Sequence, residues 1–506
     1  MVRNVRELAV AGALCVLAAC IGLLSGPALL GAEGSEVYGH TWVWWWHGEA
    51  LPGWPAGTDL AQGADPWPVI DPLPTALGGL LGQLLGHTLA WNLMAILGIA
   101  GAFAGGAFLA RRCGGEPLVG GVVLALGPIV LGSFGSGLTE DWAIGLVAIA
   151  LAFLVSGPAW VAGLLLGLTS WCGLYLALGG ALAALVLGAW RIATDRASWT
   201  SVVTAGALAL VLTLPALALQ GERIDGEGHR SGAYHEQVEP MWRLNPWKGS
   251  DLASFVTPGR VDVGDALLRR HPTYLGLSVL ILAAMARRSR WWVVLVGAGA
   301  LALGERLRFM GDPLGVANPA VTLFRLLPGV DLVNHHGRLF LVGQIALAVL
   351  AATGARRLGR ARVAAAVVAL ELALFSPQGV PLPTTPATID PLFHALPGEG
   401  PVLVIPVAGP GVAHQRPLYE QRAHGRRLVL APNRPGLTPG VASSALGLWL
   451  GGLAFSKDSA PKEAALQQLS GHAGTLVVRE PYVSRVTDAL GPPSAVGEGH
   501  AAWIVP

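Results

Sequence analysis

Long stretches without a charged residue constrain this chain more than any other feature. The longest, Trp142 to Trp190, holds 49 residues without Asp, Glu, Lys or Arg. A helix needs about 20 apolar residues to cross the hydrocarbon core of a bilayer. Only 13% of the 506 residues are charged and 53% are hydrophobic, so the chain cannot cover itself with a solvated surface. These numbers exclude a disordered chain and predict a mostly α-helical protein with many membrane spans.

The positions of Lys and Arg predict how often the chain crosses, because basic residues mark the cytoplasmic side. Arg3 and Arg6 precede the first uncharged run, so we expect the N-terminus inside and a retained first span. Arg191 and Arg196 follow the 49-residue run, which must then cross an odd number of times. We predict three short crossings there, with breaks near 157–158 and 171–173.

Eleven spans place every basic cluster of the inner loops on one side. The predicted spans cover about 8–31, 87–110, 118–133, three within 142–190, 202–219, 272–286, 291–304, one that ends before Arg356, and 363–375. The long outer loops are then 32–75, 220–271 and 305–338.

The composition changes near residue 376. Short β-rich apolar runs occur at 402–407, 427–431, 475–480 and 501–506, and a helical stretch lies at 462–469. We predict a transmembrane domain over 1–378 and a small α/β domain over 379–506 on the extracytoplasmic side.

The first outer loop gathers acids and tryptophans. It holds six acids and six of the eighteen tryptophans, and no Lys or Arg occurs between Arg6 and Arg111. Indole rings favour the membrane interface, which would place the loop along the outer surface as amphipathic helices. Alternatively, rings such as Trp42 and Trp45 stack on sugar faces. Glu36 lies about five residues beyond the first span, where partial desolvation suits a general base.

Several motifs together resemble those of the GT-C glycosyltransferases, and many bacterial membrane proteins of this type share the layout. Nearly the whole chain shares this pattern: VYGHTWVWWW (37–46), DPLP (71–74), AWNL (90–93), SGLTED (136–141), HPTYLGLSVL (271–280), FRLLPGVDLVNHHGRLFLVGQ (324–344), LPGEGPVLVIPV (396–407) and LYEQRAHGRRL (418–428). The resemblance implies an inverting transfer of a sugar from a polyprenyl-phosphate donor to an acceptor on the outer face. The acceptor is a glycan, a lipid or a protein, and the lipid phosphate is the leaving group.

The resemblance also implies roles for particular residues. Glu36 matches the acid that deprotonates the acceptor, although the family's usual residue there is Asp. Glu140 and Asp141 match a second acidic position linked to metal or acceptor binding, and the alternative is helix-end capping. Arg338 matches an arginine of the family, which we expect to bind the donor phosphate; lipid headgroups and loop packing are its alternatives.

Two further basic residues of the outer loops could serve the same phosphate, Arg243 and Lys248. Glu371, an acid inside a predicted span, fits a structural contact to the outer domain. The histidines show no zinc-ligand spacing, so we predict no metal site, although a divalent metal ion stays open as a cofactor. The cysteines are expected to be inert.

The expected partners are membrane lipid, a polyprenyl-phosphate-linked sugar and the acceptor, with no nucleic acid. The expected location is the bacterial inner membrane. Two other functions stay open at this point. A flippase or transporter for a lipid-linked sugar would use the same outer cavity without breaking a bond. A non-catalytic scaffold for envelope glycan assembly would tolerate neutralisation of the loop acids.

Overall fold

The computed structural model describes residues 2–50, 71–226, 249–258, 273–324, 335–406, 416–429, 445–446, 448–450 and 463–505. The chain forms two compact units. The first comprises Met1–Ser25, Ile70–Pro74 and Asn92–Pro383, and the second comprises Gly26–Val69, Thr75–Trp91 and Thr384–Pro506. The second unit thus combines the C-terminal segment with much of the predicted first outer loop. The division at residue 378 into a membrane domain and an outer domain stays a prediction.

The first unit is a bundle of helices. Its elements are α1 (Val2–Cys20), η1 (Ile21–Ser25), α4 (His87–Arg112, from Asn92 on), α5 (Pro117–Ala125), α6 (Pro128–Gly135), η2 (Thr139–Asp141), α7 (Ile144–Ser156), α8 (Ala159–Ser170), α9 (Leu174–Thr194), η3 (Arg196–Ser198), α10 (Trp199–Gly226), η5 (Ala253–Phe255), α14 (Leu277–Met285), α15 (Trp291–Ala302), the hairpin β2 (Arg306–Phe309) and β3 (Asp312–Ala317), α16 (Pro319–Phe324), η7 (His336–Leu339), α17 (Phe340–Leu358) and α18 (Ala361–Phe375).

The bundle has the composition of a membrane protein. Six helices among the described residues are long and apolar enough to cross a bilayer, or seven when the bent pair α5 and α6 counts as one span. The predicted breaks within 142–190 coincide with the ends of α7 and α8. Because α8, α14, α15 and α18 are shorter than a full span, the count of eleven stays a prediction.

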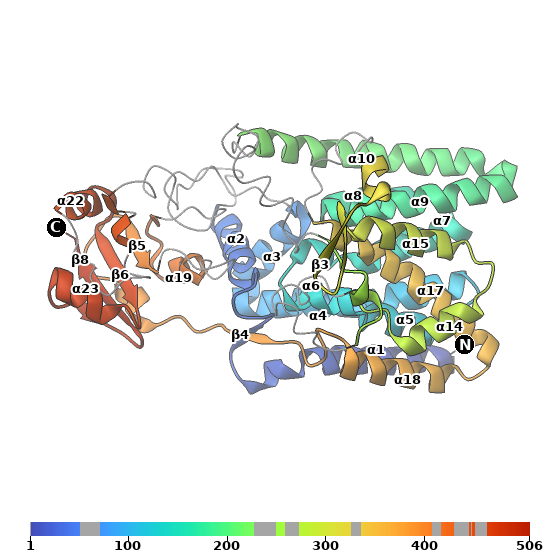
Figure 1. Ribbon diagram of the computed structural model, residues 1–506, viewed down its shortest axis with the longest axis horizontal. Coiled ribbons are helices and arrows are strands. Elements are labelled where there is room, and N and C mark those ends of the chain that lie inside the picture. Colours follow the sequence, from blue (N-terminus) through green and yellow to red (C-terminus); the bar gives the residue numbers. More distant parts are fainter. Residues whose placement is uncertain are drawn as a thin grey trace. The chain divides into compact units, whose positions relative to one another are not determined.

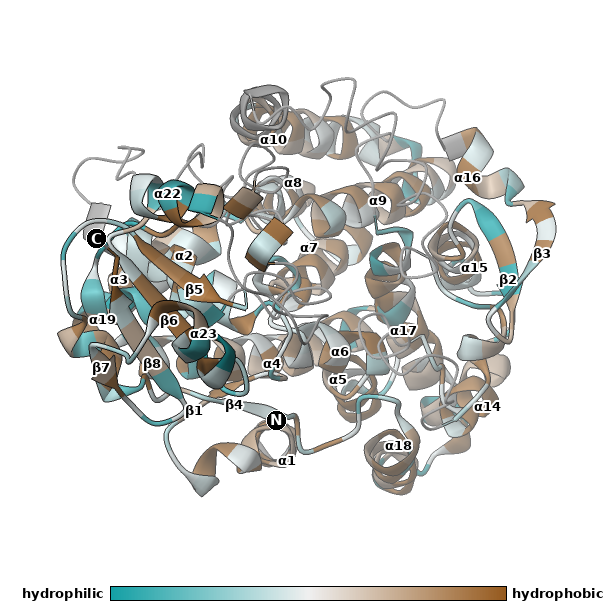
Figure 2. Ribbon diagram, turned by 60° about the vertical axis from the view of Figure 1, so that its left-hand side comes forward, coloured by the Kyte–Doolittle hydropathy of each residue, from teal (hydrophilic) through white to brown (hydrophobic). Residues whose placement is uncertain are grey.

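Helix α17 forms the centre of the first unit. Every residue from Phe340 to Ala352 is buried, and Figure 2 shows α17 among α5, α9, α14 and α15. The crossing with α14 is close because Gly354 carries no side chain: a Cβ there would lie 1.8 Å from the Leu282 carbonyl oxygen. Gln344 donates to the Val123 carbonyl at 2.9 Å, next to the 41° bend between α5 and α6. The side-chain amide of Gln344 thus takes the place of a backbone hydrogen bond that the bend removes from the helix.

Glu371 on α18 stabilises the start of α14. Its carboxylate accepts hydrogen bonds from the Tyr274 hydroxyl at 2.8 Å, from the Leu277 and Ser278 backbone amides, and from the Ser278 hydroxyl. The expected contact between Glu371 and the outer domain is therefore wrong, because these partners all belong to the first unit. A carboxylate suits this place because it satisfies amides that the first helical turn leaves open.

The second unit is built on a four-stranded sheet of order β5-β6-β8-β7. Its strands are β5 (Val402–Ile405), β6 (Thr475–Arg479), β7 (Ala495–Val496) and β8 (His500–Ile504), where β5 and β6 are parallel and β6 and β8 antiparallel. Figure 1 shows α22 and α23 beside this sheet. The other elements of the unit are β1 (Ala28–Leu30), paired with β4 (Thr384–Pro386), α2 (Val37–Ala50), α3 (Pro72–Leu85, from Thr75 on), η8 (Pro391–Ala395), α19 (Arg416–His424), α22 (Glu463–His472) and α23 (Val483–Leu490).

Three of the four predicted strand runs coincide with β5, β6 and β8. In the fourth run, 427–431, the described residues 427–429 contribute one isolated bridge, from Leu428 to Val402. Trp42 and Trp46 of α2 belong to the same apolar core as these strands. Their rings are stacked with centroids 5.9 Å apart, and Trp42 donates to the Gln421 side chain at 2.7 Å. The second unit therefore has a core that joins α2, from the N-terminal part of the chain, to the C-terminal sheet.

Candidate functional site

A buried polar cluster of the first unit joins Arg338 to two acids that are adjacent in sequence. Arg338 donates from Nε at 3.1 Å and from Nη2 at 2.6 Å to the carboxylate of Asp141, and from Nη1 at 2.7 Å to Glu140. All three side chains are buried. The bonds to Asp141 form the bidentate pair that a planar guanidinium favours. The structure thus brings Arg338 together with the acidic pair Glu140 and Asp141, which we predicted as a separate feature.

Short turns between helices place the two acids. Glu140 and Asp141 lie in η2, between α6 and α7, and Ser133 on α6 donates to Asp141 at 2.9 Å. The neighbouring Thr139 hydroxyl donates to Asp71, which is buried as well. Gly173 makes room for η2, since a Cβ there would lie 2.6 Å from the Glu140 carbonyl oxygen. The acids are thus packed inside the bundle, which corrects the alternative that they only cap a helix end.

Tyr175 at the start of α9 covers the guanidinium. The centre of its ring lies 4.4 Å from the central carbon of the Arg338 guanidinium, a distance typical of cation–π attraction. Its hydroxyl accepts a hydrogen bond from the His335 backbone amide at 2.9 Å. The tyrosine therefore fixes both the arginine and the turn that carries it.

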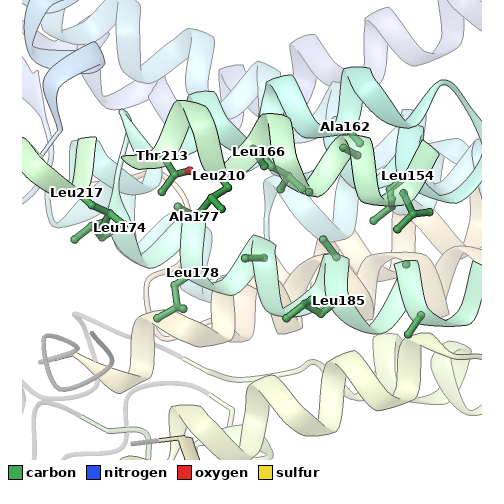
Figure 3. A pocket seen from close by; sticks show the side chains of 18 of the residues that line it. Leu154, Ala162, Leu166, Leu174, Ala177, Leu178, Leu185, Leu210, Thr213 and Leu217 are labelled. Carbon is green, nitrogen blue, oxygen red and sulfur yellow. The ribbon is translucent and has the colours of Figure 1, made fainter. Parts of the chain in front are cut away.

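An apolar cavity of about 670 Å³ adjoins this tyrosine. Side chains of α7, α8, α9 and α10 line it, and Tyr175 is one of them. In Figure 3 the labelled side chains present carbon to the cavity, with an oxygen at Thr213. Tyr175 is thus shared between an apolar cavity and a buried ionic cluster.

The charge of the cluster limits what it can bind. With both acids ionised, Glu140, Asp141 and Arg338 carry a net charge of −1, which does not attract a phosphate. The expected direct phosphate contact of Arg338 therefore needs a rearrangement, because its N–H groups already serve two carboxylates. Three of the four carboxylate oxygens already accept from Arg338 or Ser133. The cluster as it stands therefore offers few carboxylate oxygens to a divalent cation, and waters or other side chains would have to complete its coordination.

Glu36 lies in the second unit, immediately before α2. Its backbone carbonyl accepts from the His40 amide at 3.0 Å, as a residue does that begins a helix. Its carboxylate lies 3.4 Å from His40 Nε2, and the side chain is 16% exposed. The carboxylate is thus largely shielded from water and has an imidazole beside it.

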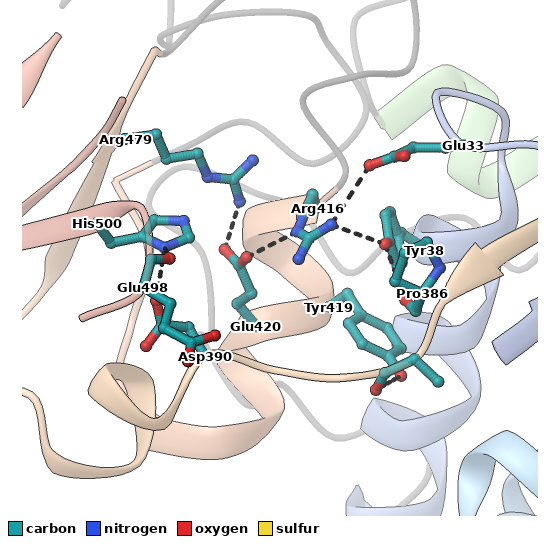
Figure 4. Close-up of polar contacts among 11 residues, drawn as sticks. Glu33, Tyr38, Pro386, Asp390, Arg416, Tyr419, Glu420, Arg479, Glu498 and His500 are labelled. Atoms are coloured by element: carbon teal, nitrogen blue, oxygen red, sulfur yellow. Dashed lines mark hydrogen bonds and ion pairs between the residues drawn. The ribbon is translucent and has the colours of Figure 1, made fainter. Parts of the chain in front are cut away.

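A second polar network surrounds α19 and is drawn in Figure 4. Arg416 donates to Glu420 at 3.0 Å and to the Tyr38 hydroxyl at 3.1 Å, and Glu33 lies 3.4 Å away. Tyr38 in turn donates to the Pro386 carbonyl at 2.9 Å. Burial raises the pKa of the Tyr38 hydroxyl, so this tyrosine stays neutral and joins α2 to α19.

The remaining predicted residues have different outcomes. Trp42 is 2% exposed, stacks on Trp46 and uses its indole N–H within the core, so stacking of Trp42 on a sugar is wrong. The surface position expected for the loop tryptophans is also wrong for Trp44, which is fully buried. Trp45 is partly buried against the same core and stays a prediction. Arg243 and Lys248 lie outside the described residues.

Sequence reasoning missed Tyr175, Ser133 and Asp71 as members of the buried cluster. Tyr175 could have been found, because it is a polar aromatic residue at a predicted break inside an uncharged run. Ser133 and Asp71 carry no such signal. The partner of Asp71, Thr139, is distant in sequence, and the partner of Ser133, Asp141, follows a turn whose geometry the sequence does not determine.

No family model and no curated protein sequence matches this chain. Among solved structures, the arabinofuranosyltransferase AftD from Mycobacteria is similar at 18% identity and a TM-score of 0.48, over 94% of this chain. The chain spans only 36% of that protein's length. ArnT from Cupriavidus metallidurans, bound to undecaprenyl phosphate, is similar at 13% identity and a TM-score of 0.44, over 99% of this chain and 97% of ArnT.

A third similar structure is the archaeal oligosaccharyltransferase AglB from Archaeoglobus fulgidus, in complex with an inhibitory peptide and a dolichol-phosphate. It shares 13% identity at a TM-score of 0.47, over 96% of this chain and 71% of AglB. At these TM-scores the likeness assigns no role to any residue here.

Proposed function

We propose that this protein transfers a sugar from a polyprenyl-phosphate donor to a glycan, lipid or protein acceptor at the outer face of a bacterial inner membrane. The observation that carries the proposal is the junction at Tyr175, where an apolar cavity adjoins a buried ionic cluster. A polyprenyl donor has the same two parts, a long apolar chain and a polar head.

Burial of ionisable groups within a membrane bundle supports a functional role. Such groups are costly in lipid and usually mark a substrate pathway or a catalytic site. Arg338, Glu140 and Asp141 could all three be replaced together by apolar residues if packing were their only duty, because a buried ion network seldom adds stability over apolar residues of similar volume. The adjacent cavity offers the prenyl chain a surface of carbon atoms.

The transfer step is assigned to Glu36. The acceptor hydroxyl oxygen attacks the anomeric carbon, and the bond from that carbon to the phosphate oxygen breaks. The acceptor's proton passes to the Glu36 carboxylate, and the polyprenyl phosphate leaves with the electron pair. Attack opposite the leaving group inverts the anomeric centre. His40, 3.4 Å from the carboxylate, orients it.

The ionic cluster is assigned to substrate positioning. Glu140 and Asp141 offer carboxylate oxygens to sugar hydroxyls, and Arg338 holds these acids in place. Direct binding of the donor phosphate by Arg338, with Arg243 and Lys248, is proposed for a rearranged, substrate-bound state. A divalent metal ion stays a prediction, and no step is routed through it.

Substitution of Glu36 by Gln tests the assignment. Gln keeps the volume but cannot take the proton, so we expect the transfer rate to fall about 10²–10⁴-fold with little change in donor affinity. The measurement is transfer of radiolabelled sugar from polyprenyl-phosphate donors by purified protein in vesicles, with cell-envelope extract as acceptor. Glu36→Asp, which restores the residue usual in the family, should retain most of the activity.

Glu33 provides the matched control, since it is an acid of the same segment and is 62% exposed. Its contact with Arg416 is a half-exposed ion pair of small energetic value. Glu33→Gln should therefore transfer sugar at the normal rate. If Glu36→Gln is as active as Glu33→Gln, Glu36 is not the base.

A further inference from the structure

The hairpin of β2 and β3 carries an exposed apolar surface that the proposed transfer reaction does not use. Phe309, Leu314 and Val316 are each about half exposed (49–53%). The hairpin starts four residues after the end of α15 and is followed by α16 and the membrane span that begins at His336. Figure 2 shows it beside α15 and α16, with hydrophilic and hydrophobic segments.

The strand pairing sorts these residues onto two faces. Phe309 pairs with Asp312, Arg308 with Pro313 and Arg306 with Ala317. Paired residues share a face and successive residues alternate between faces. A register shift lies between Arg306 and Arg308, so Leu314, Gly315 and Val316 together lie opposite Leu307. Leu314 directly follows Pro313 and Val316 directly precedes Ala317, so alternation from these two paired residues places both on the face of Phe309, opposite Arg306 and Arg308. The hairpin is amphipathic.

The turn at its tip is held rigidly. Met310 and Gly311 both have positive φ values, 55° and 89°, as the two central residues of a tight hairpin turn require. Asp251 accepts hydrogen bonds from both of their amides, at 3.1 and 2.8 Å. A methionine rarely occupies this conformation, so the fold holds an apolar side chain at a tip where Asn or Gly would be easier.

We propose that this hairpin lies in the headgroup layer of the membrane, with Phe309, Leu314 and Val316 toward the acyl chains. Three observations identify lipid as the partner. The hairpin continues directly from α15, whose Val293 and Val296 are themselves largely exposed. Arg306 is exposed on the opposite face, where it complements anionic lipid phosphates, whereas Arg308 is partly buried near Asp251. The carboxylate of Asp312, on the apolar face at the turn, keeps the hairpin shallow.

Spin labels on the two faces test this arrangement. Leu314→Cys places a label on the apolar face, and Ala317→Cys is the matched variant on the arginine face of the same strand. The full-length protein is reconstituted in vesicles of phosphatidylcholine and phosphatidylglycerol, with the unmodified protein as background. Collision rates with oxygen, which dissolves in lipid, and with a water-soluble nickel complex are then measured.

We expect the ratio of oxygen to nickel collisions to be severalfold higher at position 314 than at position 317. Equal access of both labels to the nickel complex would overturn the proposal, because the hairpin would then stand in water. A label at position 314 that is shielded from both reagents would overturn it as well, because protein rather than lipid would cover this face.

Discussion

Arg338 makes three hydrogen bonds to two buried carboxylates, whereas Arg362 lies 2.5 Å from Glu7 at the surface and is 68% exposed. The same pair of charges thus occurs in two environments. Breaking a buried pair strands charges that lipid and protein cannot solvate, and this costs about 3–5 kcal/mol. An exposed pair contributes about 1 kcal/mol or less.

Substitution of each arginine by Met should therefore give different results. Arg338→Met should lower the unfolding temperature of the purified protein strongly and abolish transfer. Arg362→Met should change neither by much. The unfolding temperature of each variant is measured by tryptophan fluorescence in detergent, and transfer is measured with the radiolabelled donor. Equal stability of the two variants would mean that Asp141 and Glu140 are neutral or solvated in the protein.

His424 makes the second unit sensitive to acid. Burial and the neighbouring positive charge of Arg426 lower the pKa of His424 from 6.5 to about 4. Its Nδ1 accepts a hydrogen bond from the Arg426 amide at 3.0 Å, which requires an unprotonated nitrogen. Since the pKa is lower in the folded state, the contribution to stability is complete above pH 6.5 and is lost as the pH falls toward 4.

We expect the second unit to lose up to about 2 kcal/mol from this group between neutral pH and pH 5. Hydrogen exchange of the β5 and β6 amides measures the loss. His424→Asn keeps a side-chain acceptor but does not titrate, so the difference between the two proteins isolates the histidine from the carboxylates. An identical pH profile for the variant would contradict the assignment.

Individual site residues were predictable only where local sequence limits their role. Glu140 and Asp141 were found because they match an acidic position of the family that the motifs resemble, and Arg338 because it precedes an uncharged helix and matches an arginine of that family. Their mutual contact was not predictable, since nearly two hundred residues separate η2 from η7. The burial of Trp42 was not predictable either, because a run of aromatic residues has the same sequence pattern at a membrane interface and in an apolar core.

At the scale of elements, helix α14 depends on an acceptor from another helix. Its N-cap, Gly276, has no side chain to cap the first turn, and Glu371 of α18 supplies the carboxylate instead. Glu371→Gln keeps one acceptor oxygen but removes the charge. We expect a loss of about 1–3 kcal/mol, as for other hydrogen bonds to a charged group.

The loss should be local, so hydrogen exchange at the Leu277 and Ser278 amides should accelerate more than exchange within α17. Tyr274→Phe, which removes one of the four donors and leaves the carboxylate in place, should have the smaller effect. Uniform acceleration across the whole first unit would show that Glu371 supports the bundle rather than the start of α14.

Helix boundaries were more predictable than helix roles. Gly157-Pro158 and Trp171-Gly173 mark the observed ends of α7 and α8, because proline lacks an amide hydrogen and glycine resists helix. The helices α14 and α15 were predicted as spans because of their apolar composition. Apolar composition does not reveal where a helix ends, and these two are short. The hairpin of β2 and β3 was missed because its Met-Gly turn lacks the usual Asn or Asp.

At the scale of the whole molecule, the low charge content predicted a membrane protein, and the apolar helices agree. The composition change near residue 376 lies close to Thr384, where the chain passes into the second unit. The share of the N-terminal segment in that unit was not predictable. It depends on contacts such as that of Trp42 with Gln421, for which no periodicity gives a signal.

The fate of a labelled donor tests the central claim, that this protein breaks the bond between sugar and lipid phosphate. Protein in sealed vesicles receives a polyprenyl-phosphate sugar labelled in the sugar, together with cell-envelope acceptor. We predict that the label leaves the lipid and appears in the acceptor, with an equal amount of polyprenyl phosphate released. Label that crosses the bilayer still attached to its lipid, without product, would contradict this account and identify a flippase.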